Sequence, residues 1–95
     1  MTESNVIRMP KRFDYSASAE FNGAVLEKLN NNQGAKQILL DCSNMDYIDS
    51  AGIGLLVMAH KKALSFNASL AIINIRPSAR EILTLANLQK LIDIQ

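Results

Sequence analysis

Runs of hydrophobic residues without polar alternation mark the expected strands of this chain. Residues 38–40 and residues 69–75 form the two strongest runs. The first predicts a strand that is buried on both faces, and the second predicts another buried strand. Residues 6–13 are a weaker extended candidate, because Pro10 breaks the strand ladder and indicates an edge strand or a bulge. Residues 91–94 are expected to form a short closing strand. The pattern therefore predicts about four strands that are well separated along the chain.

Hydrophobic residues that recur every three or four positions predict helices between these strands. The first helix is expected to begin with Ser16 or Ser18 as its cap and to stop in the turn-forming run 30–34. The third is expected to begin at Pro77, which suits a first helical position. The expected inner faces are Ala17, Phe21, Val25 and Leu29, widened by Leu26, for the first helix, and Ala79, Ile82, Leu83 and Ala86 for the third.

The middle helix, residues 51–64, is apolar around nearly its whole circumference in its first turns. These turns carry Ile53, Leu55, Leu56, Val57 and Met58. Such a helix is either covered on most sides or presents an apolar patch to a partner. Asn67 is expected to end it.

Strands and helices alternate along the chain, which predicts an α/β fold with a mostly parallel central sheet of about four strands and helices packed against it. The 95 residues, 48% hydrophobic and 20% charged, fit one globular domain over residues 1–95. The formal net charge is +1, and no basic cluster is larger than a pair of neighbours such as Lys11 with Arg12. These features argue against nucleic-acid binding.

A single cysteine, Cys42, excludes an internal disulfide. Its place at the end of an apolar run predicts a small buried hydrophobe instead of a reactive thiol. The segment 1–9 lacks the apolar centre of a signal peptide, and no apolar stretch reaches the length of about 18 residues that spans a bilayer. We therefore expect a cytoplasmic protein.

Residues 47–54 carry the most informative chemical signal. Ser50 lies where a strand gives way to a helix, so its hydroxyl is expected near the first backbone N–H groups of that helix. These donors lack partners within the helix, and the positive end of the helix dipole favours an anion there. A phosphate on Ser50 would change the local charge by about −2 at a place that tolerates it. The geometry is that of a switch.

Ser50 also has a plainer interpretation as a helix cap, since serine and aspartate are preferred at helix starts. Gly52 and Gly54 shift the balance, because glycine inside a helix costs about 1 kcal/mol relative to alanine. Two glycines in the first turns suggest that another group approaches the backbone closely. A catalytic serine is disfavoured, because the only histidine, His60, lies on the same expected helix, about 15 Å away at roughly 1.5 Å per residue.

Three carboxylates, Asp41, Asp46 and Asp49, could suggest a magnesium site, but acids at the end of a strand are commonly loop and cap residues. A glycine-rich nucleotide cradle is absent from the sequence. The sequence therefore predicts a protein that is not an enzyme and that has no metal and no cofactor.

Residues 49–54 (Asp-Ser-Ala-Gly-Ile-Gly) resemble the core motif of STAS domains, the family of anti-sigma factor antagonists. In that family Asp-Ser-(Ser/Thr/Ala)-Gly-(Leu/Ile/Val)-Gly follows a buried strand. The resemblance extends back through residues 38–48 and forward to residues 70–77. It also places Asp14 where a Leu-Asp or similar pair commonly precedes the first helix. It thus covers about residues 6–91.

The resemblance implies that Ser50 is phosphorylated by a partner serine kinase of the anti-sigma type and dephosphorylated by a metal-dependent serine phosphatase. The unphosphorylated form would bind the kinase or another regulator, and phosphorylation would release it. The expected partner-binding residues are Asp14, Asp49, Ser50, Ala51, Gly52, Ile53, Gly54 and Met58.

Two positions depart from the family pattern. Members usually begin with two paired strands, but only one fits before Asp14, so the first strand of the family is expected to be missing or very short. An exposed sheet edge and pairing of two copies into a homodimer across it are then expected. Asn87 with Leu88 stands where many relatives have Gly-Leu, and asparagine tolerates the left-handed cap conformation.

The alternative function is a non-enzymatic STAS subunit of a transporter complex, for example one that moves lipids. Some of these members carry threonine or a residue that cannot be phosphorylated at the switch position, so Ser50 favours signalling. A small nucleotide-binding protein is a third class, which no residue of the sequence demands.

Overall fold

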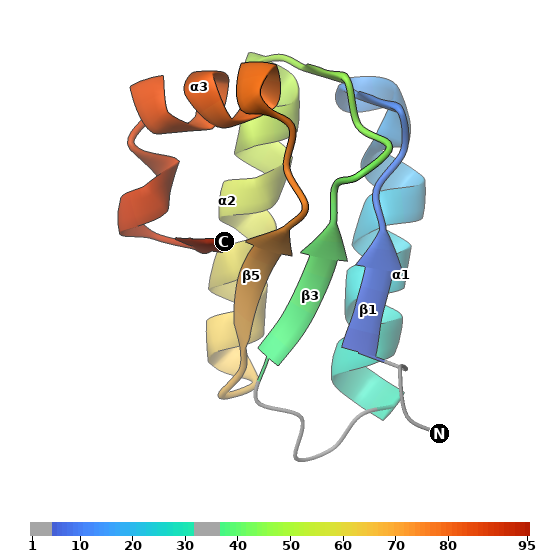
Figure 1. Ribbon diagram of the computed structural model, residues 1–95. Helices are drawn as coiled ribbons and strands as arrows, with labels where there is room; N and C mark the ends of the chain where they lie inside the picture. Colours follow the sequence, from blue (N-terminus) through green and yellow to red (C-terminus); the bar gives the residue numbers. More distant parts are fainter. Residues whose placement is uncertain (1–4, 32–36) are drawn as a thin grey trace.

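A four-stranded parallel sheet forms the centre of the computed structural model, which describes residues 5–31 and 37–95 (Figure 1). In spatial order its strands are β1 (Val6–Arg8), β3 (Gln37–Asp41), β5 (Ser69–Ile73) and β6 (Asp93–Ile94). Its helices are α1 (Ser18–Asn31), α2 (Ser50–Ser65) and α3 (Pro77–Leu85), with short 3₁₀ turns η2 (Tyr15–Ala17) and η3 (Leu88–Lys90). The alternating α/β order and the parallel sheet expected from the sequence are confirmed.

The predicted strand over residues 6–13 is divided at Pro10, as the proline indicated. Its first part is β1, at the edge of the central sheet. Its second part is β2 (Arg12–Phe13), which leaves that sheet and pairs in parallel with β4 (Tyr47–Ile48). The backbone oxygen of Lys11 accepts from the amides of Asp46 at 2.9 Å and Tyr47 at 3.2 Å. The hydrophobic pattern did not predict this small second sheet. It brings the residues that follow β2 close to the residues that follow β4.

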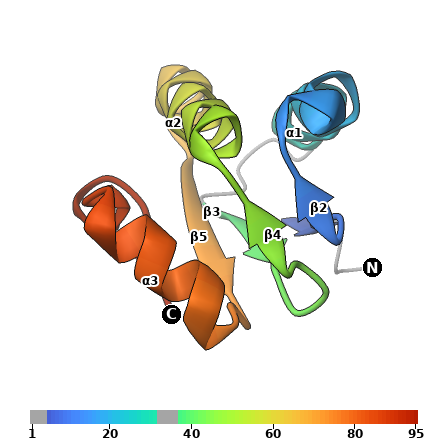
Figure 2. The ribbon, with the colours of Figure 1, turned by 90° about the horizontal axis from the view of Figure 1, so that it is seen from above.

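Helices α1 and α2 lie side by side on one face of the central sheet, behind the strands in Figure 1. Viewed from above, α3 lies on the other side of β5 from that pair (Figure 2). Leu40 is fully buried and is in register with Ile7 and Ile72, which are also buried. Leu39, one residue earlier, is only half-buried. The prediction that the strand 38–40 is buried on both faces was therefore wrong, because the helices cover its two faces unequally.

The buried residues of α1 and α3 match the centre of each predicted inner face but not its edges. Phe21, Val25, Leu29, Ala79 and Leu83 are buried as expected. Leu26 and Ile82 are 41% and 39% exposed, and Ala86 is also exposed, so these three predictions were wrong. The cause is geometric, since each helix touches the rest of the fold along a narrower stripe than its apolar residues span.

Asparagines in the left-handed conformation follow both later helices. Asn67 has φ 60° and follows the last residues of α2, and the Ala68 amide donates to the Ala63 oxygen at 2.9 Å. Asn87 has φ 61° after α3, as the comparison with Gly-Leu implied. The predicted stop at 30–34 falls partly outside the described residues, since 32–36 are not among them. Among those described, no helix is both long enough and apolar enough to cross a membrane.

Candidate functional site

Each of the two strands of the small sheet is followed directly by an aspartate that caps a helical turn. Arg12 is in register with Tyr47, and Phe13 with Ile48, so Asp14 and Asp49 follow at neighbouring positions. Neighbouring strands lie about 4.8 Å apart. The parallel pairing therefore brings Asp14 beside the Ser50 segment, although 34 residues separate the two aspartates.

Asp14 is the N-cap of η2. Its Oδ1 accepts hydrogen bonds from the backbone amide of Ser16, at 3.0 Å, and from the Ser16 hydroxyl. Its Oδ2 accepts from Arg12 Nε at 2.8 Å. The hydrogen bond from Ser16 is the largest cause that holds the pKa of Asp14 below its ordinary value, and Arg12 adds to it against partial desolvation. Ser16 and Ser18 are thus not the cap that the sequence suggested.

Asp49 is the N-cap of α2, with extended backbone angles and a side chain that accepts from the Gly52 amide at 3.0 Å. Its other oxygen lies 3.4 Å from the Tyr47 hydroxyl. Ser50 is therefore the first residue inside the helix, and the cap interpretation of Ser50 was wrong. Asp49 takes the capping position, because its backbone is still extended and its side chain accepts from the amide three residues on.

The Ser50 side chain is exposed, and within the described part of the chain its hydroxyl has no hydrogen-bond partner. The backbone amides of Ser50 and Ala51 also find no acceptor among the described residues. A hydroxyl with open access therefore lies beside two free N–H donors at the positive end of a 16-residue helix.

Gly52 is buried against the end of β2. A Cβ atom at this position would lie 2.4 Å from the backbone oxygen of Phe13 and 3.0 Å from Ile48 Cγ1. The close approach that glycine permits is therefore made by the protein's own strand. A Cβ at Gly54, by contrast, would meet no atom within 4 Å.

The remaining predicted partner-binding residues lie along the outward side of α2. Ala51 and Gly54 are exposed, Ile53 is half-buried, and Met58 is 68% exposed. Positions 50, 53, 54 and 57 share one helix face, with Met58 at its margin. The structure thus groups Asp14, Asp49 and Ser50 with an apolar helix face, while Gly52 lies beneath it.

The three carboxylates considered as a magnesium site have separate partners. Asp41 accepts from the Ser43 amide and from Asn74 Nδ2, both at 3.1 Å, and these bonds lower its pKa. Asp46 pairs with Lys11 at 3.8 Å, and Asp49 caps α2. Over residues 5–31 and 37–95, no three His, Cys, Asp or Glu side chains form a group that could hold a metal ion.

Cys42 is 1% exposed. Burial, with the charge of Asp41 as a smaller cause, raises the pKa of its thiol to about 12. The predicted role as a small buried hydrophobe is confirmed.

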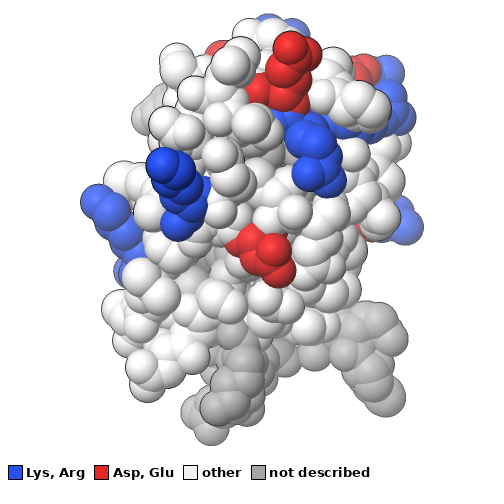
Figure 3. All heavy atoms as spheres, turned by 60° about the vertical axis from the view of Figure 1, so that its left-hand side comes forward, with Lys and Arg blue, Asp and Glu red and all other residues white. Residues whose placement is uncertain are grey.

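On the side of the molecule seen in Figure 3, acidic and basic side chains are scattered among uncharged ones.

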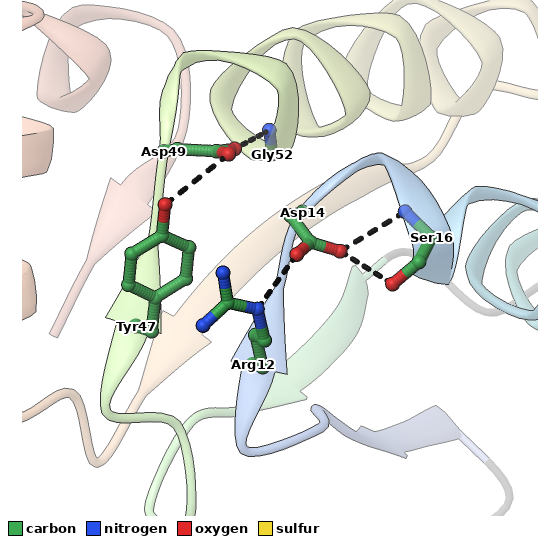
Figure 4. A network of polar contacts seen from close by, with 6 residues as sticks. All are labelled: Arg12, Asp14, Ser16, Tyr47, Asp49 and Gly52. Atoms are coloured by element: carbon green, nitrogen blue, oxygen red, sulfur yellow. Dashed lines mark hydrogen bonds and ion pairs between the residues drawn. The ribbon is translucent and has the colours of Figure 1, made fainter.

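Sequence reasoning missed Arg12 and Tyr47, which complete the cluster shown in Figure 4. The Arg12 guanidinium lies over the Tyr47 ring, with Cζ 4.1 Å from the ring centroid. Both residues precede an aspartate by two positions, Arg-x-Asp in one strand and Tyr-x-Asp in the other. In a strand this spacing places the larger residue and the aspartate on the same face, and that repeated pattern was the available signal.

The chain belongs to the STAS domain family, whose model matches residues 2–95. A STAS-domain containing protein of Pseudomonas aeruginosa (strain UCBPP-PA14), PA14_20770, is 30% identical over 88 residues, which cover 93% of this chain and 84% of that protein. The family expected from residues 49–54 is therefore confirmed.

Solved structures share the fold. The crystal structure of TM1081 from Thermotoga maritima, described as a candidate anti-sigma factor antagonist, has a TM-score of 0.78 and 24% identity, covering 99% of this chain and 80% of that one. The Bacillus cell fate determinant SpoIIAA in its phosphorylated form has a TM-score of 0.68 and 16% identity, covering 100% of this chain and 86% of that one. This chain thus shares its fold with both proteins.

Proposed function

We propose that this STAS domain is a regulatory binding protein switched by phosphorylation of Ser50. The unphosphorylated protein binds a regulator, such as a serine kinase of the anti-sigma type, through the Ser50 segment and the outward side of α2. The kinase transfers the terminal phosphoryl group of ATP to Ser50 Oγ, with ADP as the leaving group and loss of the hydroxyl proton, and the modified protein is released. A metal-dependent serine phosphatase removes the group with water and restores binding. The protein itself acts by binding and not by catalysis.

The observation that carries the proposal is that Asp49 caps α2 while the Ser50 side chain stays exposed. Asp49 supplies the cap that α2 needs, so the Ser50 hydroxyl has no structural task among the described residues. It is exposed and lies beside free backbone donors. A kinase can reach such a hydroxyl, and the helix N-terminus can hold the resulting charge without a change of fold.

The release follows from the surroundings of Ser50. Neighbouring Ala51 is exposed, and Ile53 and Met58 offer apolar surface on the same helix. A partner that covers this surface must desolvate or repel a phosphate of about two negative charges. Each 1.4 kcal/mol of that cost lowers affinity about tenfold. A solved structure of SpoIIAA in phosphorylated form supports the proposal by likeness of fold.

Intact-mass spectrometry of the protein isolated from its native cells tests the modification. Wild type is expected to carry one added phosphoryl mass that the Ser50→Ala variant lacks. A Ser16→Ala variant is the matched control, because Ser16 is also exposed and lies in the neighbouring turn. A phosphoryl mass that persists in Ser50→Ala, or that is absent under every growth condition, contradicts the proposal and favours a constitutive subunit.

A further inference from the structure

Arg12 is the single cation in contact with the Asp14–Asp49 cluster among the described residues. It donates through Nε to Asp14 at 2.8 Å and stacks on Tyr47, whose hydroxyl lies 3.4 Å from Asp49. The other nearby cation, Lys11, is paired with Asp46. The cluster therefore holds two carboxylates and one guanidinium, and its formal charge is −1.

The terminal nitrogens of Arg12 are not committed. Within the described residues, Nε makes the one hydrogen bond recorded for this side chain, and the side chain is 64% exposed. Guanidinium groups pair with phosphate through two parallel N–H···O bonds, a stronger arrangement than a single bond to a carboxylate. Arg12 thus has both free donors and the freedom to turn from Asp14 toward a stronger acceptor.

Phosphorylation changes the electrostatics of this cluster. Ser50 directly follows Asp49, and a phosphate there takes the formal charge from −1 to about −3. Figure 4 shows the guanidinium on the side of the β2–β4 pair where the Asp49 carboxylate also lies. The one available cation is then drawn toward the new charge, because both side chains are exposed and, among the described residues, Arg12 is held at the surface by one hydrogen bond to Asp14 and by its contact with the Tyr47 ring.

We infer that Arg12 changes its partner when Ser50 is phosphorylated. Its side chain leaves Asp14 and Tyr47 and pairs with the phosphoryl oxygens. The unmodified protein presents an exposed guanidinium over Tyr47 to its partner. The phosphorylated protein withdraws it, so the partner loses a cationic contact in addition to meeting the phosphate. This inference rests on the proposed function for its biological use, and its chemistry can be tested separately.

The test uses full-length protein with phosphoserine incorporated at position 50 during translation, which requires no kinase. Phosphorus NMR gives the second pKa of the phosphoryl group, ordinarily about 6. A guanidinium paired with the phosphate favours the dianion and lowers this pKa. The Arg12→Ala variant is therefore expected to titrate about half a unit higher than the parent protein, and Arg12→Lys, which keeps the charge but not the paired geometry, between the two.

The matched control is Lys11→Ala, at the position directly before Arg12. It removes the same charge, but the Lys11 side chain is 76% exposed and pairs with Asp46. It is expected to leave the phosphoserine pKa almost unchanged. An Arg12→Ala shift no larger than that of Lys11→Ala overturns the inference. Because the phosphate is installed without the native kinase, this outcome is independent of whether cells phosphorylate Ser50. Absence of phosphate in cells would instead defeat the proposed function alone.

Discussion

Replacing Gly52 by alanine inserts a methyl group where the start of α2 meets the end of β2. The new Cβ would lie 2.4 Å from the Phe13 backbone oxygen and 3.0 Å from both Phe13 Cδ2 and Ile48 Cγ1. A backbone oxygen cannot rotate away, so β2 or α2 must shift. Overpacking of this kind costs about 1–3 kcal/mol, whereas alanine regains at most about 1 kcal/mol of helix propensity.

Gly54→Ala is the matched control for this substitution, two residues further along the same helix. A Cβ there meets no atom within 4 Å, so only the propensity gain of up to about 1 kcal/mol applies. We therefore expect Gly52→Ala to be less stable than wild type and Gly54→Ala to be equally or more stable. The two variants should differ by about 2 kcal/mol in the free energy of unfolding.

Urea unfolding followed by circular dichroism measures both free energies, and thermal unfolding gives a second readout. A domain of this size shifts its melting temperature by about 4–8 °C for each 1 kcal/mol. A Gly52→Ala variant as stable as Gly54→Ala would refute the reasoning. It would mean that the contact between Gly52 and the Phe13 oxygen does not constrain the Ser50 segment.

Three further expectations concern single residues. Asp49→Ala removes the cap of α2 and should lower the free energy of unfolding by about 1 kcal/mol in urea; an unchanged midpoint would contradict the capping role. Cys42, with a thiol pKa of about 12, should react with a thiol reagent at about pH 8 only when urea unfolds the protein; rapid labelling of the native protein would be inconsistent with its burial. Hydrogen bonds from the Ser43 amide and Asn74 lower the pKa of Asp41 from 3.8. Its contribution to the free energy of unfolding is therefore complete above the pKa of the unfolded state and is lost as pH falls through the lower pKa of the folded state. Asp41→Asn should therefore flatten the fall in stability below about pH 4 in urea titrations, and an unaltered slope would oppose this.

Local chemistry explains which parts of the fold the sequence predicted. Pro10 divided an extended segment, and Asn67 and Asn87 adopt the left-handed conformation that ends helices. These outcomes depend on one residue and its immediate neighbours. The burial of Leu39 and Ile82 depends instead on how much of each face the rest of the fold covers. Hydrophobicity alone does not contain that information.

The same distinction applies to the site. The position of Ser50 at a strand–helix junction follows from local pattern, and the structure has it there. Whether Asp49 or Ser50 caps the helix could not be decided, because both residue types are preferred at that position. The contact of Arg12 with Tyr47 depends on the pairing of two-residue strands, which are too short to show any hydrophobic period.

A phosphate on Ser50 is expected to release a bound partner. A regulator isolated with the Ser50→Ala variant and then purified can be titrated calorimetrically with unmodified protein and with protein that carries phosphoserine at position 50. The phosphorylated form is expected to bind at least about tenfold more weakly, which corresponds to about 1.4 kcal/mol, while Ser50→Ala binds as well as unmodified protein. Equal affinities for the phosphorylated and unmodified forms would contradict it.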